Sequence, residues 1–323
     1  MRKDIAARAE RAIREKVFPG CVVGIVRTGR EREVMPFGHF TYGTGSEAVG
    51  EHTVYDLASI TKSIPSASLA LTLIAEGKLQ LDDPATKYLP ELQNDHGATI
   101  EDLLRYRVHG AQLSKLGYQT FEEIRTHALE RGFDGAPGES VYTNLPAFLL
   151  GIILERVAGA SLPVLAHRTL FEPLNMKETT FFPSRENCAP TEVDDVRGEV
   201  RGLPHDESAY LFAKKRRAVG HAGLFSSALD LLNFLETLLN GKLGAIARGA
   251  KVGLGWQTEG VFLGSHPVGR FGKTGFTGTS ILCDMERGVG LVILSNRTYP
   301  HRPSDSNAIN AVRLEIADVA LSA

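Results

Sequence analysis

Tyr55-Asp56-Leu57-Ala58-Ser59-Ile60-Thr61-Lys62 is the stretch that says most about the fold and chemistry of this chain, and it precedes a long apolar run. Residues three apart lie on the same face of a helix, so the pattern predicts that the Lys62 amine lies one turn beyond the Ser59 hydroxyl. A serine hydroxyl is a weak nucleophile until a base accepts its proton, and a partly desolvated lysine amine can be that base. Roughly one S-x-x-K is expected by chance in a chain of this length, so other motifs must support the assignment.

Two later motifs carry side chains whose chemistry complements this pair. Tyr142-Thr143-Asn144 follows a Gly/Pro-rich loop, and Gly272-Lys273-Thr274-Gly275 ends a predicted strand. A tyrosine phenol near two ammonium groups has a lowered pKa and can shuttle a proton. An asparagine amide can hydrogen-bond both to a lysine and to a substrate carbonyl. The second lysine adds positive potential and can meet a substrate carboxylate.

The strand end that carries the second lysine also offers backbone donors. One N–H from Ser59 and one from Phe276 could form an oxyanion hole, which stabilises the charge of a tetrahedral intermediate. Gly275 and Gly278 would let a substrate approach the backbone closely. The three motifs together therefore predict a site for nucleophilic catalysis by a serine.

The order S-x-x-K, Y-x-N, K-T-G resembles the penicillin-recognising serine hydrolases, which include class C β-lactamases, DD-peptidases and related esterases. The likeness covers most of the chain, from Phe18-Pro19-Gly20 to Leu291–Arg297. It implies that Ser59 is the acylated nucleophile, Lys62 its base and Tyr142 a proton shuttle that also serves the deacylating water. It implies further substrate-binding roles for Asn144, Lys273, Thr274, Gly275 and Phe276.

The chain departs from that family pattern in two places. Many relatives carry a Leu-Thr-His-x-Ser-Gly-Leu-like loop after Leu103-Leu104, where this chain reads Arg105-Tyr106-Arg107-Val108-His109-Gly110-Ala111-Gln112-Leu113. That loop usually lies near the catalytic cleft, so the change bears on substrate choice. Many esterase-like relatives also have histidine at the position of Lys273, and lysine there is closer to the β-lactamases.

Hydrophobic periodicity predicts an α+β fold. Strands are expected at 21–26, 31–40, 268–274, 279–285 and 289–295. Helices are expected at 4–16, 59–75 with a kink at Pro65, 100–106, 121–131, 145–158, 162–170, 228–239 and 308–321. We expect residues 1–75 and 216–323 to form an antiparallel β-sheet flanked by N- and C-terminal helices, with residues 76–215 as an inserted, mainly helical subdomain and the active site at the interface. This is the β-lactamase/transpeptidase-like architecture that the resemblance implies.

Several other polar groups have simpler interpretations. His221, in a glycine-rich turn, is interpreted as a structural histidine. His205-Asp206-Glu207 is interpreted as a polar loop near the cleft rim rather than a metal or acid–base cluster. The basic cluster Lys214-Lys215-Arg216-Arg217 is either a solvated loop or helix end, or a group that steers an anionic ligand.

The composition bounds the partners and the compartment. Hydrophobic residues make up 43% and charged residues 23%, as in soluble globular proteins, and a net charge of −2 argues against nucleic-acid binding. Three widely spaced cysteines and histidines without H-E-x-x-H spacing predict no disulfide framework, metal site or cofactor. No run approaches the ~20 apolar residues of a membrane span. The segment Met1–Arg8 is amphipathic rather than signal-like, so a cytoplasmic protein is expected, although a chain whose leader had been removed would look the same. The oligomeric state is left open.

These observations lead to one expectation and two alternatives. We expect a serine hydrolase that acts on an ester, amide or β-lactam bond of a small-molecule or peptide-like substrate through a Ser59 acyl-enzyme. An esterase or small-amide hydrolase comes first, because a cytoplasmic protein would not meet cell-wall or β-lactam substrates. The alternatives are a β-lactamase or DD-peptidase, and a non-catalytic ligand-binding or scaffold protein of the same fold, which the altered loop at 105–113 suggests.

Overall fold

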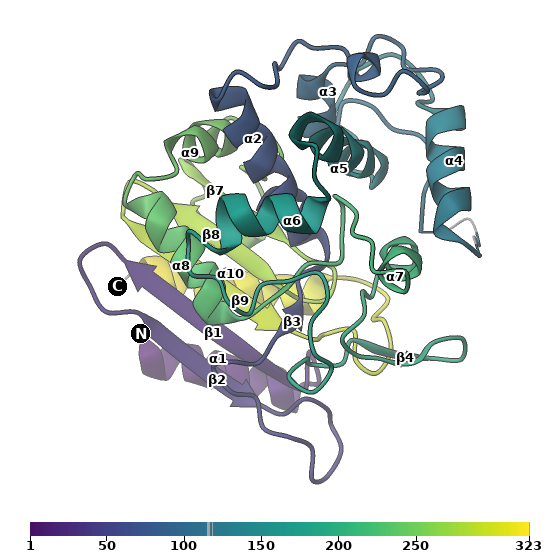
Figure 1. Cartoon of the computed structure of the whole chain (residues 1–323). Coiled ribbons are helices and arrows are strands. Elements are labelled where there is room, and N and C mark those ends of the chain that lie inside the picture. The colour runs from purple at the N-terminus through teal and green to yellow at the C-terminus, as the bar shows by residue number, and fades with distance from the viewer. Residues whose placement is uncertain (115–116, 118, 323) are drawn as a thin grey trace.

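The computed structural model describes residues 1–114, 117 and 119–322, and its central layer is an antiparallel sheet (Figure 1). Hydrogen bonds order the strands β2-β1-β9-β8-β7. Their bounds are β1 Gly20–Arg27, β2 Glu33–Gly38, β7 Arg270–Thr274, β8 Ser280–Asp284 and β9 Val289–Ser295. Two strands come from the start of the chain and three from its last quarter, so the sheet joins distant parts of the sequence.

Strand β1 makes this junction, because it pairs with β2 on one side and with β9 on the other. Val23 lies opposite Met35 of β2 and Ile293 of β9. All eight residues of β1 are buried. Successive side chains point to opposite faces, so Val23 enters the core beneath the terminal helices and Val22 enters the larger core on the other face. Burial on both faces explains why the strand reads as a nearly continuous apolar run.

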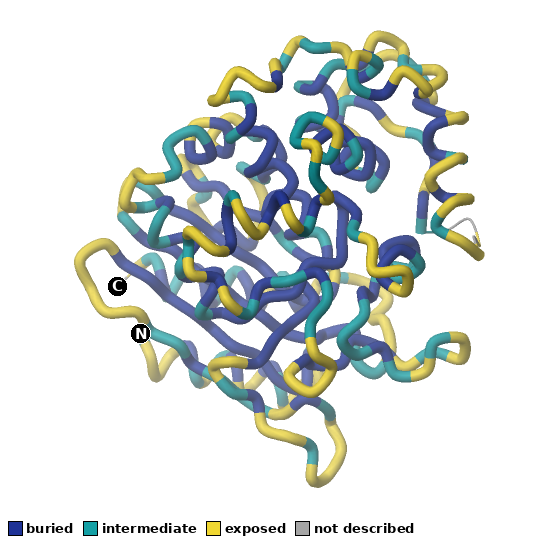
Figure 2. The backbone as a smooth tube through the Cα atoms, in the orientation of Figure 1, coloured by how far each residue is buried: buried dark blue, intermediate teal, exposed yellow. Residues whose placement is uncertain are grey.

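Helices cover both faces of the sheet. Helices α1 (Arg2–Arg14) and α10 (Asn307–Leu321) pack against each other and share a core with one face. Helix α8 (Ala228–Leu239) crosses the other face, where its Leu232 would contact a Cβ at Gly24 of β1 at 3.1 Å. Figure 2 shows the strands as a buried layer between these helices. The terminal helices and the sheet therefore form one sandwich.

The other helices of the described chain lie mainly beyond the α8 face, and Figure 1 places α3, α4 and α5 at the end of the molecule far from α1. Their bounds are α2 Ser68–Ala75, α3 Ile100–Leu104, α4 Phe121–Arg131, α5 Leu145–Ala158, α6 Leu162–Ala166, α7 Glu207–Ala213 and α9 Gly244–Lys251. Two short ladders pair β3 Tyr55–Asp56 with β6 Phe225–Ser226, and β4 Glu192–Asp194 with β5 Gly198–Val200. The division into subdomains at residues 75 and 216 stays a prediction.

The helix expected around Pro65 is broken into three segments. A 3₁₀ helix spans Ala58–Lys62, a π-helical turn spans Ser63–Ala67, and α2 follows. Ile64 leaves the helical region, with φ −120° and ψ 111°, next to a proline that has no N–H to donate. The run Ala58–Ala75 is long and apolar enough to cross a membrane by composition, but 78% of it is buried in the fold, as in a core helix.

The predicted α+β fold with terminal helices on an antiparallel sheet is confirmed, whereas α7, α9 and the short ladders were not predicted. Helix α9 contains two glycines in eight residues, and glycine disfavours helix by about 1 kcal/mol per residue. Packing explains Gly249, because a Cβ there would lie 2.3 Å from Leu71 Cδ2 of α2. Tertiary contact thus outweighs local propensity in this helix.

Candidate active site

The Ser59 hydroxyl and the Lys62 amine meet at the start of the broken helix. Lys62 Nζ donates to Ser59 Oγ at 2.9 Å and to the His221 carbonyl oxygen at 2.9 Å. Lys62 is only 1% exposed, whereas Ser59 is partly exposed. The hydroxyl is therefore accessible from outside, and the amine contacts it from within the protein.

A strained turn presents this hydroxyl. Ala58 has φ +46°, in the left-handed region that costs a non-glycine residue about 1–2 kcal/mol. The Ala58 N–H donates to Asp56 Oδ1 at 2.8 Å, and Thr61 Oγ1 donates to the Ala58 carbonyl at 2.7 Å. These two bonds hold the strained conformation immediately before Ser59.

Lys273 lies on β7, covered by two tyrosine rings. Its Nζ is 4.7 Å from the Tyr142 ring centroid and 5.0 Å from the Tyr106 ring centroid, and the side chain is 1% exposed. Burial lowers the pKa of Lys273 to about 8. The neighbouring Thr274 turns toward Gln257, whose Oε1 accepts from its N–H at 3.2 Å and its hydroxyl at 3.4 Å. The Lys273 ammonium therefore lies close enough to both rings for its charge to act on the Tyr142 phenol.

Tyr142 lies between the two amines. Lys62 Nζ is 5.2 Å from the Tyr142 ring centroid. Tyr142 itself is 53% exposed. Burial of the phenol raises its pKa, but the charges of Lys62 and Lys273 outweigh this effect, so the pKa of Tyr142 falls to about 8. A phenol with this pKa can both accept and donate a proton near neutral pH.

Asn144 comes two residues after Tyr142, and its side chain contacts a carboxylate. Its Nδ2 donates to Asp206 Oδ2 at 3.1 Å and to Ser114 Oγ at 3.2 Å. Within the described residues, no hydrogen bond joins Asn144 to a lysine, which differs from the sequence expectation. The carboxylate takes the amide protons, so the amide oxygen is oriented by Asp206 rather than by an amine.

Asp206 is a polar residue of this site that was assigned from sequence only to a polar loop near the cleft rim. Its Oδ1 accepts from Ser208 Oγ at 2.6 Å and lies 3.3 Å from His221 Nε2. Burial lowers the pKa of His221, which keeps the ring neutral at pH 7. Asp206 therefore contacts both Asn144 and His221, and the His221 carbonyl in turn accepts from Lys62. A signal for Asp206 existed, because an Asp before an apolar helical pattern is a typical N-cap.

No group of three or more His, Cys, Asp or Glu side chains among the described residues could hold a metal ion. The segment His205-Asp206-Glu207 is no exception, because its three residues contact different partners. The His205 N–H donates to Asp56 Oδ2, and Glu207 pairs with Arg302. The sequence interpretation of this segment as a polar loop therefore missed the inward-facing middle residue.

The K-T-G strand continues into a loop that is fastened to the turn before Ser59. Thr277 Oγ1 donates to the Asp56 carbonyl at 2.7 Å, and Thr279 Oγ1 donates to the Leu57 carbonyl at 3.2 Å. A Cβ at Gly275 would lie 2.3 Å from that same Leu57 carbonyl. Glycine is therefore required at this position for close backbone approach. These contacts bring the two predicted sources of oxyanion donors side by side.

Two buried arginines hold the loop from behind. Arg313 Nη2 of α10 donates to the Gly275 carbonyl at 3.0 Å and the Thr279 carbonyl at 2.8 Å, and Arg297 Nε donates to the Phe276 carbonyl at 2.8 Å. Burial lowers the pKa of Arg313 to about 9, so it stays protonated at pH 7. The carbonyl of a trans peptide points away from the following N–H. Holding the Gly275 carbonyl toward Arg313 therefore turns the Phe276 N–H to the opposite side.

Replacing Arg313 by methionine is expected to lower kcat about tenfold with little change in KM, because a mobile Gly275–Phe276 peptide loses part of one oxyanion donor. Steady-state kinetics, normalised to the folded fraction from thermal melts, would measure the effect.

Arg27→Met is the matched control for this variant. Arg27 is also buried, and its Nη2 donates to the Ala320 carbonyl of the same helix at 2.7 Å, but it does not contact the loop. An equal loss of kcat in both variants would show that Arg313 serves stability alone.

Comparisons with known proteins identify one family and one fold. A family model described as Beta-lactamase matches residues 5–315. A putative D-alanyl-D-alanine carboxypeptidase of Escherichia coli (strain K12) is 30% identical over 312 residues, which cover 78% of this chain and 70% of that protein. An N-acetylmuramyl-L-alanine amidase of Bacillus subtilis (strain 168) is 27% identical over 345 residues, which cover 87% and 78%.

Solved structures share the architecture. EstCE1, a hydrolase with promiscuous acyltransferase activity, has a TM-score of 0.74 and 22% identity and covers 98% of this chain and 97% of its own. A class C beta lactamase from Rhodobacter sphaeroides has a TM-score of 0.75 and 22% identity, with 99% of both chains covered. Likeness at this level of identity establishes the fold, and it confirms the predicted β-lactamase/transpeptidase-like arrangement.

Proposed function

The chain belongs to the beta-lactamase family and is a serine hydrolase, as its three motifs predicted, and we propose that it cleaves a carboxylic ester or a small amide through an acyl-enzyme on Ser59. One observation carries this proposal: a hydroxyl, two amines and a phenol converge. The Ser59–Lys62 distance is 2.9 Å, and both amines lie within 5.2 Å of the Tyr142 ring centroid. A pure binding site has no chemical need for all four groups.

In the proposed acylation, Lys62 first passes a proton to the Tyr142 phenolate, and the neutral Lys62 amine then accepts the Ser59 proton as Ser59 Oγ attacks the substrate carbonyl carbon. The carbonyl oxygen becomes an oxyanion, which the N–H groups of Ser59 and Phe276 stabilise. The bond to the leaving alcohol or amine then breaks. Tyr142 shuttles the proton to that group, so a neutral alcohol or amine departs and the acyl group stays on the serine.

Deacylation reverses these roles with water as the nucleophile. Tyr142 accepts a proton from water, and the hydroxide attacks the acyl carbon. The second tetrahedral intermediate uses the same backbone donors. Ser59 Oγ leaves with a proton returned through Lys62, which releases the carboxylic acid and restores the resting enzyme. Tyr142 is half-exposed as a residue, so this side of the site is open to solvent.

The burial of Lys273 favours a neutral ester over a substrate with a terminal carboxylate. A carboxypeptidase must bind that carboxylate, but Lys273 lies beneath two phenol rings. Arg297 lies near the same loop but already donates to the carbonyls of Phe276 and Asp305, so these N–H groups do not serve a substrate carboxylate. D-alanyl-D-alanine carboxypeptidase or β-lactamase activity is the second candidate, and the name of the Escherichia coli relative favours the carboxypeptidase.

A substrate panel tests the proposal. Purified protein would be assayed with p-nitrophenyl esters of increasing acyl length, with nitrocefin and with a peptide that ends in D-Ala-D-Ala, and intact mass would be recorded after fluorophosphonate or penicillin treatment. Ester turnover with a covalent adduct is the expected result. Faster turnover of nitrocefin or the peptide would select the second candidate, and binding without any adduct or turnover would favour the non-catalytic alternative.

Lys273→Met is expected to move the alkaline rise of kcat/KM to higher pH. The Lys273 charge helps to hold the pKa of Tyr142 near 8, so its removal raises that pKa and leaves less phenolate at any lower pH. The profile would be measured with an ester from about pH 6 to about pH 10. Lys251→Met, at an exposed lysine, is the control. An unshifted profile for Lys273→Met would contradict the role of the phenol.

A further inference from the structure

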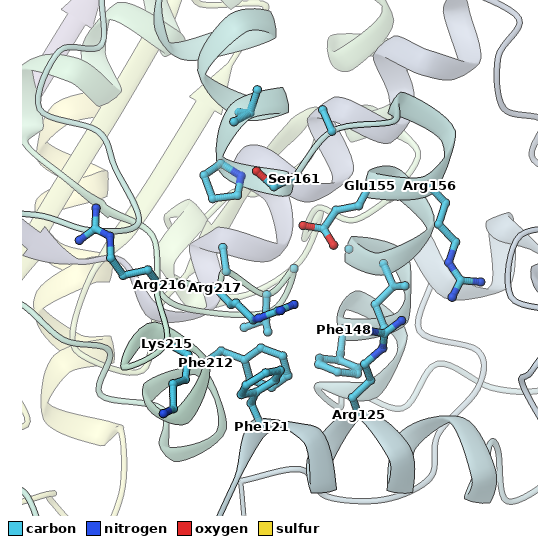
Figure 3. Close-up of a pocket in the computed structure, with 18 of the residues that line it drawn as sticks. Phe121, Arg125, Phe148, Glu155, Arg156, Ser161, Phe212, Lys215, Arg216 and Arg217 are labelled. Atoms are coloured by element: carbon cyan, nitrogen blue, oxygen red, sulfur yellow. The ribbon is translucent and has the colours of Figure 1, made fainter.

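A large cavity, about 810 Å³ in volume, opens between α4, α5, the start of α6 and the segment 215–220 (Figure 3). None of the proposed catalytic or substrate-binding residues lines it. Its size suits a small organic ligand, since such sites typically enclose about 300–1,000 Å³. The cavity is therefore separate from the site on Ser59.

Three phenylalanine rings form the apolar floor of this cavity, as Figure 3 shows. The centroids of Phe121 and Phe212 are 5.2 Å apart, and those of Phe148 and Phe212 are 5.7 Å apart. Phe148 and Phe212 are buried, whereas Phe121 is partly exposed. Such a floor favours a flat, apolar group, because aromatic rings gain from offset or edge contacts.

Cationic side chains surround the floor. Arg217 Cζ lies 4.8 Å from the Phe121 ring centroid, and Arg125 of α4 lies across the cavity from it. Neither guanidinium has a hydrogen bond or an ion pair with another described residue. Arg156, on the same wall, differs because it is paired with Glu91. Among the described residues no side chain takes the N–H donors of these two forks, although both charges act on the nearby Glu155 carboxylate.

Glu155 is the only acidic residue that lines the cavity in the described chain. The Leu162 N–H donates to its Oε1 at 2.7 Å, and burial raises its pKa. Lys215 and Arg216 add to the positive charge of the rim. Four cations with no ion-pair partner therefore face one carboxylate, in a chain whose net charge is −2. The local potential is positive in spite of the overall charge.

We propose that this cavity binds a small aromatic anion, in which a carboxylate, sulfonate or phosphate is attached to a flat apolar group. Arg125 and Arg217 bind the anionic group, because a guanidinium offers paired N–H donors that match carboxylate and phosphate oxygens. The phenylalanine floor receives the apolar group. Of the two interpretations of the basic cluster at 214–217, the cavity favours an anionic ligand for Arg217.

The test is calorimetric titration of the whole protein with 2-naphthoate, beside 2-naphthol and inorganic phosphate as probes that lack one of the two features. Naphthoate is expected to bind at least tenfold more tightly than either probe. The titration is repeated after Ser59 has been blocked by a fluorophosphonate, and the binding should persist. If no adduct forms, the native titration alone decides, so the outcome does not depend on the proposed hydrolase activity.

Matched variants locate the binding. Arg217→Gln is expected to weaken naphthoate at least tenfold, since it removes a charge-assisted hydrogen bond. Lys214→Gln removes one positive charge three residues earlier in the same basic cluster. The Lys214 Nζ lies over the Tyr210 ring and outside the cavity, so this variant should change affinity less than twofold. Glu155→Gln is expected to strengthen binding by removing a repulsion.

Four results would overturn the proposal. Equal affinity for naphthol would indicate a merely apolar cavity, and equal affinity for phosphate would indicate a surface anion effect. Equal losses in the Arg217 and Lys214 variants would show that net charge, not the cavity, governs binding. Weaker binding in Glu155→Gln would mean that the carboxylate contacts the ligand. Thermal melts of each variant would verify that these outcomes refer to folded protein.

Discussion

Replacing Ser59 by alanine is expected to lower kcat for ester hydrolysis by about 10⁵- to 10⁶-fold and to abolish covalent labelling by a fluorophosphonate. The substitution removes the atom that forms the proposed acyl bond, so only binding and oxyanion stabilisation would remain. Intact-mass spectrometry measures the adduct, and initial rates at saturating ester measure kcat.

Ser265→Ala provides the control for this experiment. Ser265 is exposed, its Oγ donates to Asp318, and it lies outside the proposed site. Its alanine variant should keep wild-type labelling and turnover. An adduct that persists in Ser59→Ala, or a turnover within tenfold of wild type, would mean that another residue is the nucleophile.

Replacing Lys62 by methionine is expected to slow acylation by about 10³- to 10⁴-fold, the size of effect that a positioned general base supplies. Methionine keeps most of the side-chain volume but cannot accept the Ser59 proton. The His221 carbonyl also loses its donor, so some loss of stability is expected. Single-turnover labelling by a fluorophosphonate measures acylation apart from product release.

Lys62→Arg separates the two roles of this residue. An arginine keeps the positive charge beside Tyr142 but stays protonated, so it cannot act as the base. Both variants should therefore acylate slowly, and Lys87→Met, at an exposed lysine, should not. If Lys62→Arg acylated within a few-fold of wild type, the charge rather than the base would be the essential property, and the base would have to be reassigned to Tyr142.

Local sequence patterns predicted the elements whose periodicity is strong. The bounds of β9, α4, α5 and α8 were those expected from sequence, and the bounds of β1, β2, β7, β8 and α10 agree within two residues. These elements could be predicted because a strong hydrophobic period indicates both the type of element and the face that it buries. The short ladders β3–β6 and β4–β5 have too few residues to carry a period. The broken geometry around Ile64 also depends on packing that no local pattern contains.

The residues of the site also fall into those that local sequence predicts and those that depend on long-range packing. The spacing of Ser59 and Lys62 is local, so their contact could be predicted from a single turn of helix. Tyr106 belongs to the loop at 105–113, whose departure from the family pattern was visible in the sequence. Its contact with Lys273 depends on long-range packing and could not be predicted. Asp206 and Arg313 act through contacts with residues 62 and 38 positions away, to Asn144 and Gly275. Sequence separation of this kind leaves no periodic signal.

The pairing of β1 with β9 has a consequence for how the protein matures during synthesis. A ribosome delivers Ser59 about 200 residues before the strands that complete the sheet and before the K-T-G loop. Non-local pairing of this kind forms late, after its loop-closure entropy has been overcome. A nascent chain that already carries Ser59 should therefore be chemically silent until β7, β8 and β9 have been translated, because the proposed oxyanion donor at Phe276 is not yet in place.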